Sequence, residues 1–388
     1  MTDEHYMQRA LELAARGLYT TSPNPRVGCV IVRHQQIVGE GWHQQAGGPH
    51  AEVHALQQAG GNARGATAYV TLEPCSHHGR TPPCADALIR AGVSRVVGAV
   101  RDPNPEVAGR GYQKLRDAGI TVTEACLEDK ARQLNEGFFL RMTRGRPFVR
   151  LKLAMSLDGR TAMASGESQW ITGAEARRDV QTLRARSCAI ITGADSVLID
   201  NPAMTVRPRE AGLDIPAGLE RQPLRVIIDG QQRLDPGRRI FTEKGDILLA
   251  GTRPRVQPFQ RDPALGSLSE WHGEKQGKTD LTSLLDHLGS LGCNEVLVET
   301  GAQLAGAFVA AGLVDELVIY CAPTLLGSRA RPLLDLGLDK MKQQLRWHWQ
   351  DVSMSGNDLR LTLRPEAAAA ETGQGITEAF LKEHGFWK

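Results

Sequence analysis

The sequence predicts an α/β protein built from two consecutive α/β units. One observation is that short apolar runs alternate with stretches in which apolar residues recur at helical spacing. A second is that residues 143–147, Thr-Arg-Gly-Arg-Pro, are short and polar and contain Gly and Pro, which is typical of a linker. We therefore expect domains at 1–146 and 147–364, followed by a tail at 365–388.

In the first unit, a helix at 3–16 is expected because its apolar residues share one face and Thr2 is a suitable N-cap. Strands are then expected at 27–32, 36–41, 66–72, 94–100 and 119–124, and helices at 51–59, 84–90 and 109–117. This order predicts a mixed sheet flanked by helices.

In the second unit, strands are expected at 148–155, 188–192, 224–229, 246–250, 294–299 and 315–321, with helices at 173–186, 280–291 and 303–311. The polar stretches 202–223 and 254–278 are interpreted as surface loops. The unit lacks a Gly-x-Gly-x-x-Gly fingerprint, so a Rossmann dinucleotide site is not supported. The turn from Glu299 to Gly306 still offers backbone amides for a phosphate, although glycine there is more often a steric requirement.

Composition narrows the class of protein. The chain has 46 Lys and Arg against 44 Asp and Glu, which gives no electrostatic case for a nucleic-acid or membrane surface. No signal-like or bilayer-spanning apolar run is present. Seven cysteines in a chain of this length fit reduced thiols, so we expect a cytoplasmic enzyme. In the tail, 376–386 has the pattern of a short helix after a flexible spacer, with a frayed terminus as the default.

The most informative motif combines His50, Glu52, Cys75 and Cys84. One imidazole and two thiolates are three zinc ligands, and they leave a fourth position for water, as in catalytic zinc sites. Zinc lowers the pKa of bound water to roughly 7, and a nearby carboxylate such as Glu52 can carry the proton. A His-x-Glu and Pro-Cys-x-x-Cys pair is typical of zinc nucleobase deaminases. Here the residues 76–83 separate the two cysteines.

Other interpretations of this motif are weaker. Either cysteine alone would be an ordinary buried thiol. A metalloprotease pair of His50 and His54 would need Glu directly after the first His, where Ala51 stands. A nucleic-acid base deaminase with an unrelated second domain would need a basic stripe and stacking aromatics, but aromatics are only 5% of the chain. A structural zinc clip in an interaction module would need a fourth protein ligand.

Several segments resemble the bifunctional deaminase/reductase of riboflavin biosynthesis, over about residues 1–364. In the first half they are 23–25, 27–30, 50–52, 73–84 and 102–105; in the second half they are 152–160, 166–172, 200–202 and 205–207. The insert between the cysteines is a feature of that family. The resemblance implies a cytidine-deaminase-like three-layer α/β/α domain and a dihydrofolate-reductase-like α/β domain.

The resemblance also implies two reactions on phosphorylated pyrimidines. A zinc site, one ion per chain, hydrolytically deaminates 2,5-diamino-6-ribosylamino-4(3H)-pyrimidinone 5′-phosphate. NADPH then reduces the ribosyl group of 5-amino-6-(5-phosphoribosylamino)uracil to ribityl. We expect small-molecule substrates, no nucleic acid, no membrane, and a homo-oligomer.

Site residues follow position by position from the resemblance. In the first unit, Glu52 is catalytic, zinc is bound by His50, Cys75 and Cys84, and substrate is bound by Asn24, His43, Arg80, Asp102 and Asn104. In the second unit, NADP is bound by Ala154, Trp170, Ser196, Asp200, Gly230, Gly301, Ala302, Gln303, Leu304, Ala305, Gly306 and Ala307. Reductase substrate is bound by Ser168, Arg184, Met204, Arg207 and Glu299, and Lys152 and Asp158 are candidates for orienting or protonating the imine. Ala302-Gln303 departs from the family's tighter glycine- or proline-bearing turn.

Overall fold

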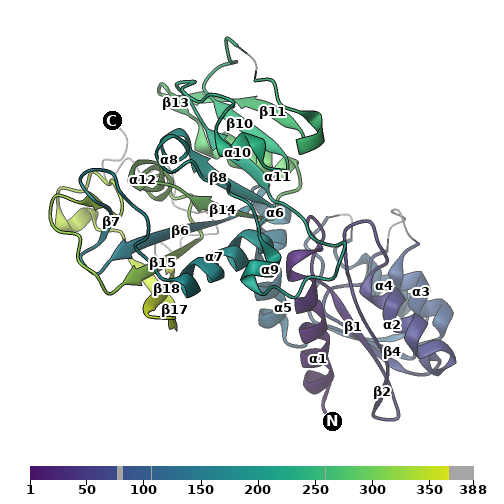
Figure 1. The fold of residues 1–388 in the computed structure, drawn as a ribbon. Helices are drawn as coiled ribbons and strands as arrows, with labels where there is room; N and C mark the ends of the chain where they lie inside the picture. Colours follow the sequence, from purple (N-terminus) through teal and green to yellow (C-terminus); the bar gives the residue numbers. More distant parts are fainter. Residues whose placement is uncertain (77–81, 106, 258, 367–388) are drawn as a thin grey trace. The chain divides into compact units, whose positions relative to one another are not determined.

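The computed structural model describes residues 1–76, 82–105, 107–257 and 259–366 (Figure 1). Arg80 and the tail beyond 366 therefore lie outside the described residues. The chain divides into two compact units. The first is Met1–Arg146 with two short segments, Ile215–Glu220 and Gly292–Asn294, and the second holds the remaining residues from Pro147 onward. Among the described residues, none of the helices has the length and apolar character needed to cross a membrane.

The first unit has six helices and five strands within its described residues. The helices are α1 (Asp3–Ala15), α2 (Ala51–Ala59), α3 (Cys84–Ala91), α4 (Arg110–Asp117), α5 (Glu128–Leu134) and α6 (Glu136–Arg144). The strands are β1 (Gly28–Arg33), β2 (Gln36–Trp42), β3 (Thr67–Val70), β4 (Arg95–Gly98) and β5 (Thr121–Thr123), and 3₁₀ turns lie at Arg16–Tyr19 and Gly60–Ala63.

The five strands form one mixed sheet in the order β2-β1-β3-β4-β5. β1 runs antiparallel to both its neighbours, whereas β3, β4 and β5 are parallel. Because side chains alternate along a strand, Cys29 and Ile31 pack with α2, α3 and α4, while Val30 and Val32 pack with α1, α5 and α6. The unit is a three-layer α/β/α sandwich, as expected.

The second unit is built around one long sheet. Its strands are β6 (Phe148–Ser156), β8 (Ala189–Gly193), β9 (Leu224–Ile228), β10 (Ile247–Gly251), β11 (Leu268–His272), β14 (Glu295–Glu299), β15 (Glu316–Ala322), β17 (Trp347–Ser355) and β18 (Asp358–Pro365). The helices are α7 (Ala174–Arg186), α8 (Ala194–Asp200), α9 (Pro208–Ala211), α10 (Arg239–Thr242), α11 (Leu281–Ser290) and α12 (Ala302–Ala310). Short strand pairs and turns complete it: β7 (Arg160–Ala162), β12 (Glu274–Lys275), β13 (Lys278–Thr279), β16 (Arg331–Pro332), and 3₁₀ turns at Pro263–Leu265 and Met341–Gln343.

The nine strands are ordered β11-β10-β9-β8-β14-β6-β15-β18-β17 (Figure 1). From β11 to β15 all neighbours are parallel, so their carboxyl ends share one edge. β18 and β17 are added antiparallel as a hairpin. α7, α8 and α10 pack on one face through a buried cluster that includes Ile190, Ile227 and Leu297. The predicted α/β class is confirmed for both units.

Several elements differ from the expectations. The expected loops at 202–223 and 254–278 are wrong in part, because α9 lies in the first and β11 in the second. β11 is mostly exposed and has polar residues among its apolar ones, so it carries little strand signal. α5, α6 and the β17–β18 hairpin were also not expected. β17 is exposed at most of its positions, which hides the alternation of a half-buried strand.

A strand glycine fixes the position of the helix that carries the metal motif. A Cβ at Gly41 would lie 2.3 Å from the carbonyl oxygen of Ala51 and 2.6 Å from the amide nitrogen of Ala55. The backbone of α2 therefore lies directly against β2, and the helix face that meets the sheet consists of the buried residues Ala51, Ala55 and Ala59.

We expect Gly41→Ala to destabilise the first unit by about 1–3 kcal/mol, because the added methyl must push α2 away from the sheet. Chemical denaturation of the purified protein measures this loss. Gly61→Ala is the control, because a Cβ there meets nothing within 4 Å. Equal stability of the two variants would contradict the packing argument.

Candidate active sites in the two units

Three metal-ligating side chains meet in the first unit, two of them at helix starts. His50 is the N-cap of α2, Cys84 is the first residue of α3, and Cys75 follows β3. Their ligand atoms all lie within 4.8 Å of one another. His50 Nδ1 is 3.3 Å from Cys84 Sγ and 3.6 Å from Cys75 Sγ. An imidazole and two thiolates at these separations suit a tetrahedral zinc ion, whose ligand bonds are about 2.0–2.3 Å long.

The electrostatics of the two sulfurs also fit a dication. The Cys84 thiol is the largest cause that lowers the pKa of Cys75, to about 4, and the Cys84 amide and His50 assist against the opposing effect of burial. The Cys84 amide nitrogen lies 3.3 Å from Cys75 Sγ. The pKa of Cys84 is raised, by its hydrogen bond to Cys75 and by burial. A second thiolate beside the first is thus unfavourable until a cation balances the charge.

Glu52 lies in the first turn of α2 and is only 3% exposed. Its Oε2 atom is buried and has no hydrogen-bond partner among the described residues. Burial raises the pKa of Glu52; His50 opposes this rise and the charge of Cys75 adds to it. A carboxyl with a raised pKa, an unsatisfied oxygen and a neighbouring metal cluster is suited to accept and return a proton.

Asn24 and His43, both predicted to bind substrate, lie together beside the cluster. His43 Nε2 is 3.0 Å from Asn24 Nδ2, and His43 Nδ1 is 3.0 Å from the carbonyl oxygen of Pro49. Burial lowers the pKa of His43, so the neutral ring donates from Nδ1 to Pro49 and accepts at Nε2 from Asn24. The His43 and His50 rings are edge to face, with centroids 5.3 Å apart.

Asp102 and Asn104 form a turn after β4. Asp102 Oδ1 accepts the amide of Asn104 at 2.8 Å, and the amide of Asp102 donates to Glu73 Oε2 at 3.3 Å. Glu73 was not among the predicted site residues, although it immediately precedes Pro74 and Cys75 in the metal motif.

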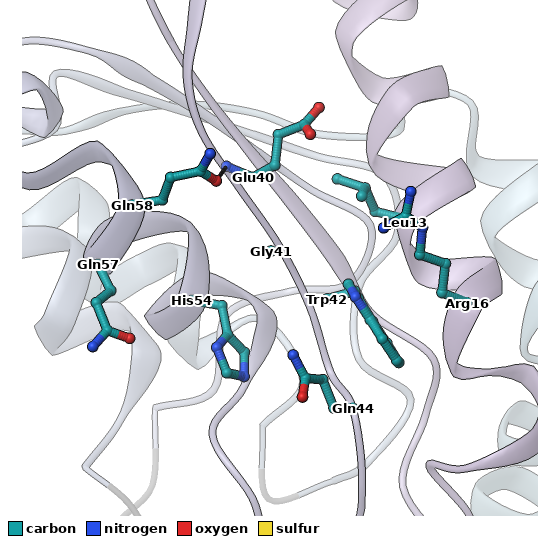
Figure 2. Close-up of a pocket in the computed structure, with 9 residues that line it drawn as sticks. All are labelled: Leu13, Arg16, Glu40, Gly41, Trp42, Gln44, His54, Gln57 and Gln58. Atoms are coloured by element: carbon teal, nitrogen blue, oxygen red, sulfur yellow. Dashed lines mark hydrogen bonds between the residues drawn. The ribbon is translucent and has the colours of Figure 1, made fainter. Parts of the chain in front are cut away.

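A cavity of about 450 Å³ lies beside β2 and α2 (Figure 2). It is lined by Leu13, Arg16, Glu40, Gly41, Trp42, Gln44, His54, Gln57 and Gln58, so the metal cluster does not line it. His50 has extended backbone angles, φ −76° and ψ 165°, and precedes the first helical turn. The group of metal-ligating atoms contains His50 but not His54, which lines the cavity instead, so the described residues do not support a metalloprotease pair.

In the second unit, the predicted substrate residues Arg184, Met204 and Glu299 are in contact. Arg184 binds Glu299 through two hydrogen bonds, Nε to Oε1 at 2.6 Å and Nη2 to Oε2 at 3.0 Å. It also donates to the Thr205 carbonyl at 3.2 Å and lies 3.7 Å from Met204 Sδ. Lys152 is directly opposite Glu299 in the sheet register, and its Nζ lies 5.8 Å from the centre of the Tyr320 ring.

Burial and the neighbouring charges shift the pKa values of Lys152 and Glu299. Burial lowers the pKa of Lys152; Glu299 opposes this and Arg184 adds to it. Burial would raise the pKa of Glu299, but Arg184 and Lys152 outweigh it and lower the pKa. The result is a carboxylate with two cationic neighbours, one of which releases its proton more readily than an ordinary lysine.

The predicted cofactor turn lies at the carboxyl edge of the same sheet. Gly301 is the N-cap of α12 and has no side chain to cap the first amides of the helix, which suits a helix start that binds a phosphate. A Cβ at Gly193, the last residue of β8, would lie 3.2 Å from Leu304 and 3.4 Å from Thr300. Ser196, Asp200 and Gly230 follow the ends of β8 and β9, the strands next in the sheet.

The remaining predicted cofactor and substrate residues have the following contacts. Ser168 donates to Asp200 at 2.9 Å, and Trp170 is exposed, with Arg177 4.7 Å from the centre of its ring. Arg207 pairs with Glu210 on the surface, and Ala154 lies in β6 opposite Tyr320.

Asp158 has a different environment. It accepts the Ser156 hydroxyl and the amides of Leu326 and Gly327, and these bonds hold its pKa at about 2. Such a carboxylate is ionised near neutral pH, so this geometry suits the anchoring of a turn better than the donation of a proton.

Two family matches cover most of the chain. Residues 1–100 match the family described as the cytidine and deoxycytidylate deaminase zinc-binding region, and residues 147–361 match the RibD C-terminal domain. Together with the His-Cys-Cys cluster, these matches define a zinc-binding deaminase unit joined to a reductase unit.

Similarity extends over nearly the whole length of known proteins. Riboflavin biosynthesis protein RibD of Escherichia coli (strain K12) is 53% identical over 368 residues, which cover 94% of this chain and 99% of that protein. The structure of Acinetobacter baumannii RibD superposes with a TM-score of 0.86 at 49% identity, covering 94% of this chain and 99% of that one. A Thermotoga maritima structure described as a diaminohydroxyphosphoribosylaminopyrimidine deaminase/5-amino-6-(5-phosphoribosylamino)uracil reductase gives 0.82 at 34% identity, covering 94% and 98%. The chain belongs to the RibD family, which confirms the resemblance seen in its motifs.

The Arg184–Glu299 pair predicts a pH-dependent contribution to stability. Because the folded pKa of Glu299 is lowered, its contribution is present above the unfolded pKa of about 4.3 and is lost as pH falls through the folded pKa. Glu299→Gln should therefore cost on the order of 3 kcal/mol at pH 7 and progressively less below pH 4. Thermal unfolding at several pH values measures this difference.

Glu210→Gln serves as the control, because its pair with Arg207 is exposed and should contribute little. If the cost of Glu299→Gln is the same at pH 3.5 and pH 7, the ion pair is not its source.

Proposed function

We propose that this chain catalyses two consecutive reactions of riboflavin biosynthesis in the cytoplasm. The first is hydrolytic deamination of 2,5-diamino-6-ribosylamino-4(3H)-pyrimidinone 5′-phosphate. The second is reduction of the ribosyl group of 5-amino-6-(5-phosphoribosylamino)uracil to ribityl by NADPH. The observation that carries the proposal is the convergence of His50, Cys75 and Cys84 beside the buried carboxyl of Glu52, in a chain that matches RibD proteins along its length.

For deamination, His50, Cys75 and Cys84 hold one zinc ion. When bound, zinc supplies Lewis acidity that makes hydroxide accessible near neutral pH. Glu52 takes a proton from the water that adds to the amino-bearing ring carbon. It later returns a proton to the amino group, which leaves as ammonia while the carbonyl forms. The raised pKa of Glu52 suits both transfers.

Substrate recognition in the first unit falls to Asn24, His43, Asp102 and Asn104. The neutral His43 fixes the Asn24 amide, and the turn at Asp102 presents polar groups after the end of a strand. Arg80, which lies outside the described residues, is proposed to bind the phosphate because a guanidinium matches phosphate oxygens in geometry.

For reduction, the 301–307 turn, together with Ala154, Trp170, Ser196, Asp200 and Gly230, is proposed to bind NADPH at the carboxyl edge of the sheet. Ser168, Arg184, Met204, Arg207 and Glu299 bind the ribotide. When bound, NADPH would supply the hydride that C1 of the ring-opened imine accepts, and a side chain of this unit would supply the proton that the imine nitrogen gains. Lys152 is the proposed proton donor, since burial lowers its pKa, whereas Asp158 is held ionised near neutral pH. We assign deamination to residues 1–146 and reduction to 147–364, with 365–388 as a tail.

The variant Glu52→Gln tests two assignments: the role of Glu52 in proton transfer, and the division of the two reactions between separate units. The variant should retain zinc but lose deamination by at least about 10²-fold, because the amide cannot carry the proton. Metal analysis and ammonia release from the diaminopyrimidinone ribotide measure these outcomes.

Oxidation of NADPH with the deaminated ribotide supplied directly should be unchanged in this variant, and NADH should support a slower reaction. Appreciable ammonia release by Glu52→Gln would refute its role. Loss of both activities in a folded, zinc-loaded variant would refute the assignment to separate units.

We further propose that the chain forms a homo-oligomer through the β17–β18 hairpin. Paired residues of the two strands put six apolar side chains on one face: Trp349, Val352, Met354, Leu359, Leu361 and Leu363. Leu363 is buried within the unit, whereas Trp349, Val352, Met354 and Leu359 are exposed. Trp349 is 61% exposed and Met354 62%. The opposite face is polar and binds α7, where Arg360 pairs with Asp179 at 2.8 Å. β17 is also an edge strand, so a two-fold axis would set this self-complementary strip against its own copy.

Light scattering of the purified protein should therefore report a dimer or higher assembly, and the double variant Trp349→Glu, Met354→Glu should lower the mass to that of a monomer. Val256→Glu, at another exposed apolar position, is the control and should not change the mass. A monomeric unaltered chain would contradict the proposal. The proposal would also be contradicted if a chain ending at Glu366 became monomeric while the double variant stayed assembled, because residues 367–388 would then make the contact.

A further inference from the structure

One buried carboxylate of the first unit accepts four backbone amides. Glu73 follows β3 and is 3% exposed. Its Oε2 accepts the amides of Asp102 at 3.3 Å and Gly109 at 2.9 Å. Its Oε1 accepts the amides of Gly111 at 2.8 Å and Tyr112 at 3.3 Å. Both oxygens are thus used to hold main chain that is distant in sequence.

The amides of Gly109, Gly111 and Tyr112 form the start of α4. The N-cap residue of this helix is Gly109, which has no side chain to cap it, and its first turn contains no acidic residue. Glu73 supplies from another element the negative charge that a helix N-terminus favours. Capping by a side chain from the segment after β3 also fixes the position of the helix.

A close backbone approach makes the arrangement rigid. A Cβ at Gly111 would lie 1.9 Å from the carbonyl oxygen of Pro74 and 3.1 Å from Glu73 Oε1. Gly111 therefore lets α4 lie directly on the Pro74-Cys75 peptide group. The second residue of that group is the metal ligand Cys75, whose carbonyl accepts the amide of Ala85 at 3.2 Å.

We propose that Glu73 is a positioning residue for deamination, a role that rests on the proposed function. It fixes the turn that carries Asp102 and Asn104 at a set distance from the segment that supplies Cys75. Asp102 continues the chain of contacts, since its own carboxylate accepts the Asn104 amide at 2.8 Å. Glu73 thereby sets the distance between the substrate-recognising turn and the reacting centre, without touching the substrate itself.

The proposal predicts a particular kinetic signature. The turn would contact substrate in both ground and transition states, so its loosening should raise KM more than it lowers kcat. For Glu73→Gln we expect KM for the diaminopyrimidinone ribotide to rise roughly tenfold or more, with kcat within about threefold. The amide keeps the size of the side chain but turns an NH₂ group toward backbone donors, so two of the four bonds are lost.

The experiment compares Glu73→Gln, Glu73→Asp and the unaltered full-length protein, each loaded with zinc. Asp129→Asn is the matched control, because it changes a carboxyl to an amide at an exposed residue in the first turn of α5. Zinc content, NADPH oxidation with deaminated ribotide, and the KM and kcat of ammonia release are measured. Zinc content and NADPH oxidation should be unchanged in all variants, and Glu73→Asp, which keeps the charge, should recover part of the KM.

A normal KM in Glu73→Gln overturns the proposal, as does a fall in kcat alone. If that variant does not fold, Glu73→Asp decides, and a KM equal to that of the unaltered protein overturns it. If the unaltered zinc protein releases no ammonia, the proposed function fails instead. Hydrogen exchange of Glu73→Gln and the unaltered protein then still tests whether Glu73 fixes the turn. Faster exchange of the variant in peptides containing Asp102 supports that positioning, and unchanged exchange refutes it.

Discussion

The first unit depends on helix N-termini that meet negative groups at one edge of the sheet. α2 begins at His50, beside Glu52; α3 begins at Cys84, whose amide lies near the Cys75 sulfur; and the start of α4 lies on the Glu73 carboxylate. Each helix start offers unpaired amides and the positive end of its dipole. Each helix start therefore favours a negative group beside it, whereas the raised pKa of Cys84 shows that a second thiolate beside Cys75 still needs the charge of a cation.

The second unit places buried charge at both edges of its sheet, with different consequences. At the carboxyl ends, Arg184 and Glu299 lie beside Lys152 and the glycine turn before α12. At the amino ends, the fully buried Arg150 pairs with Glu295 at 3.2 Å and with Glu316. Only the first group coincides with the predicted site residues, in agreement with the rule that open α/β sheets bind ligands at their carboxyl edges.

Much of the fold and the metal cluster could be predicted because their signals are local. His50, Glu52, Cys75 and Cys84 stand in short motifs, and the main helices and buried strands have clear apolar periods. Glu73 was missed as a site residue because its four partners lie 29 to 39 residues away and are backbone amides, which have no sequence signature. The β17–β18 hairpin and β11 were missed because their exposed positions mix polar and apolar residues. Arg80 lies outside the described residues, so its role stays a prediction.

The contact between β2 and α2 has a consequence for altering this enzyme. Where Gly41 meets the carbonyl of Ala51, main chain touches main chain, and no side chain between them can be exchanged for a larger or smaller one. The contact between β2 and α2 thus fixes the position of the helix start that carries His50 and Glu52. Under the proposed assignment of Asn24 and Asp102 to substrate binding, changes of pyrimidine preference belong in those two segments rather than at this contact between main chains.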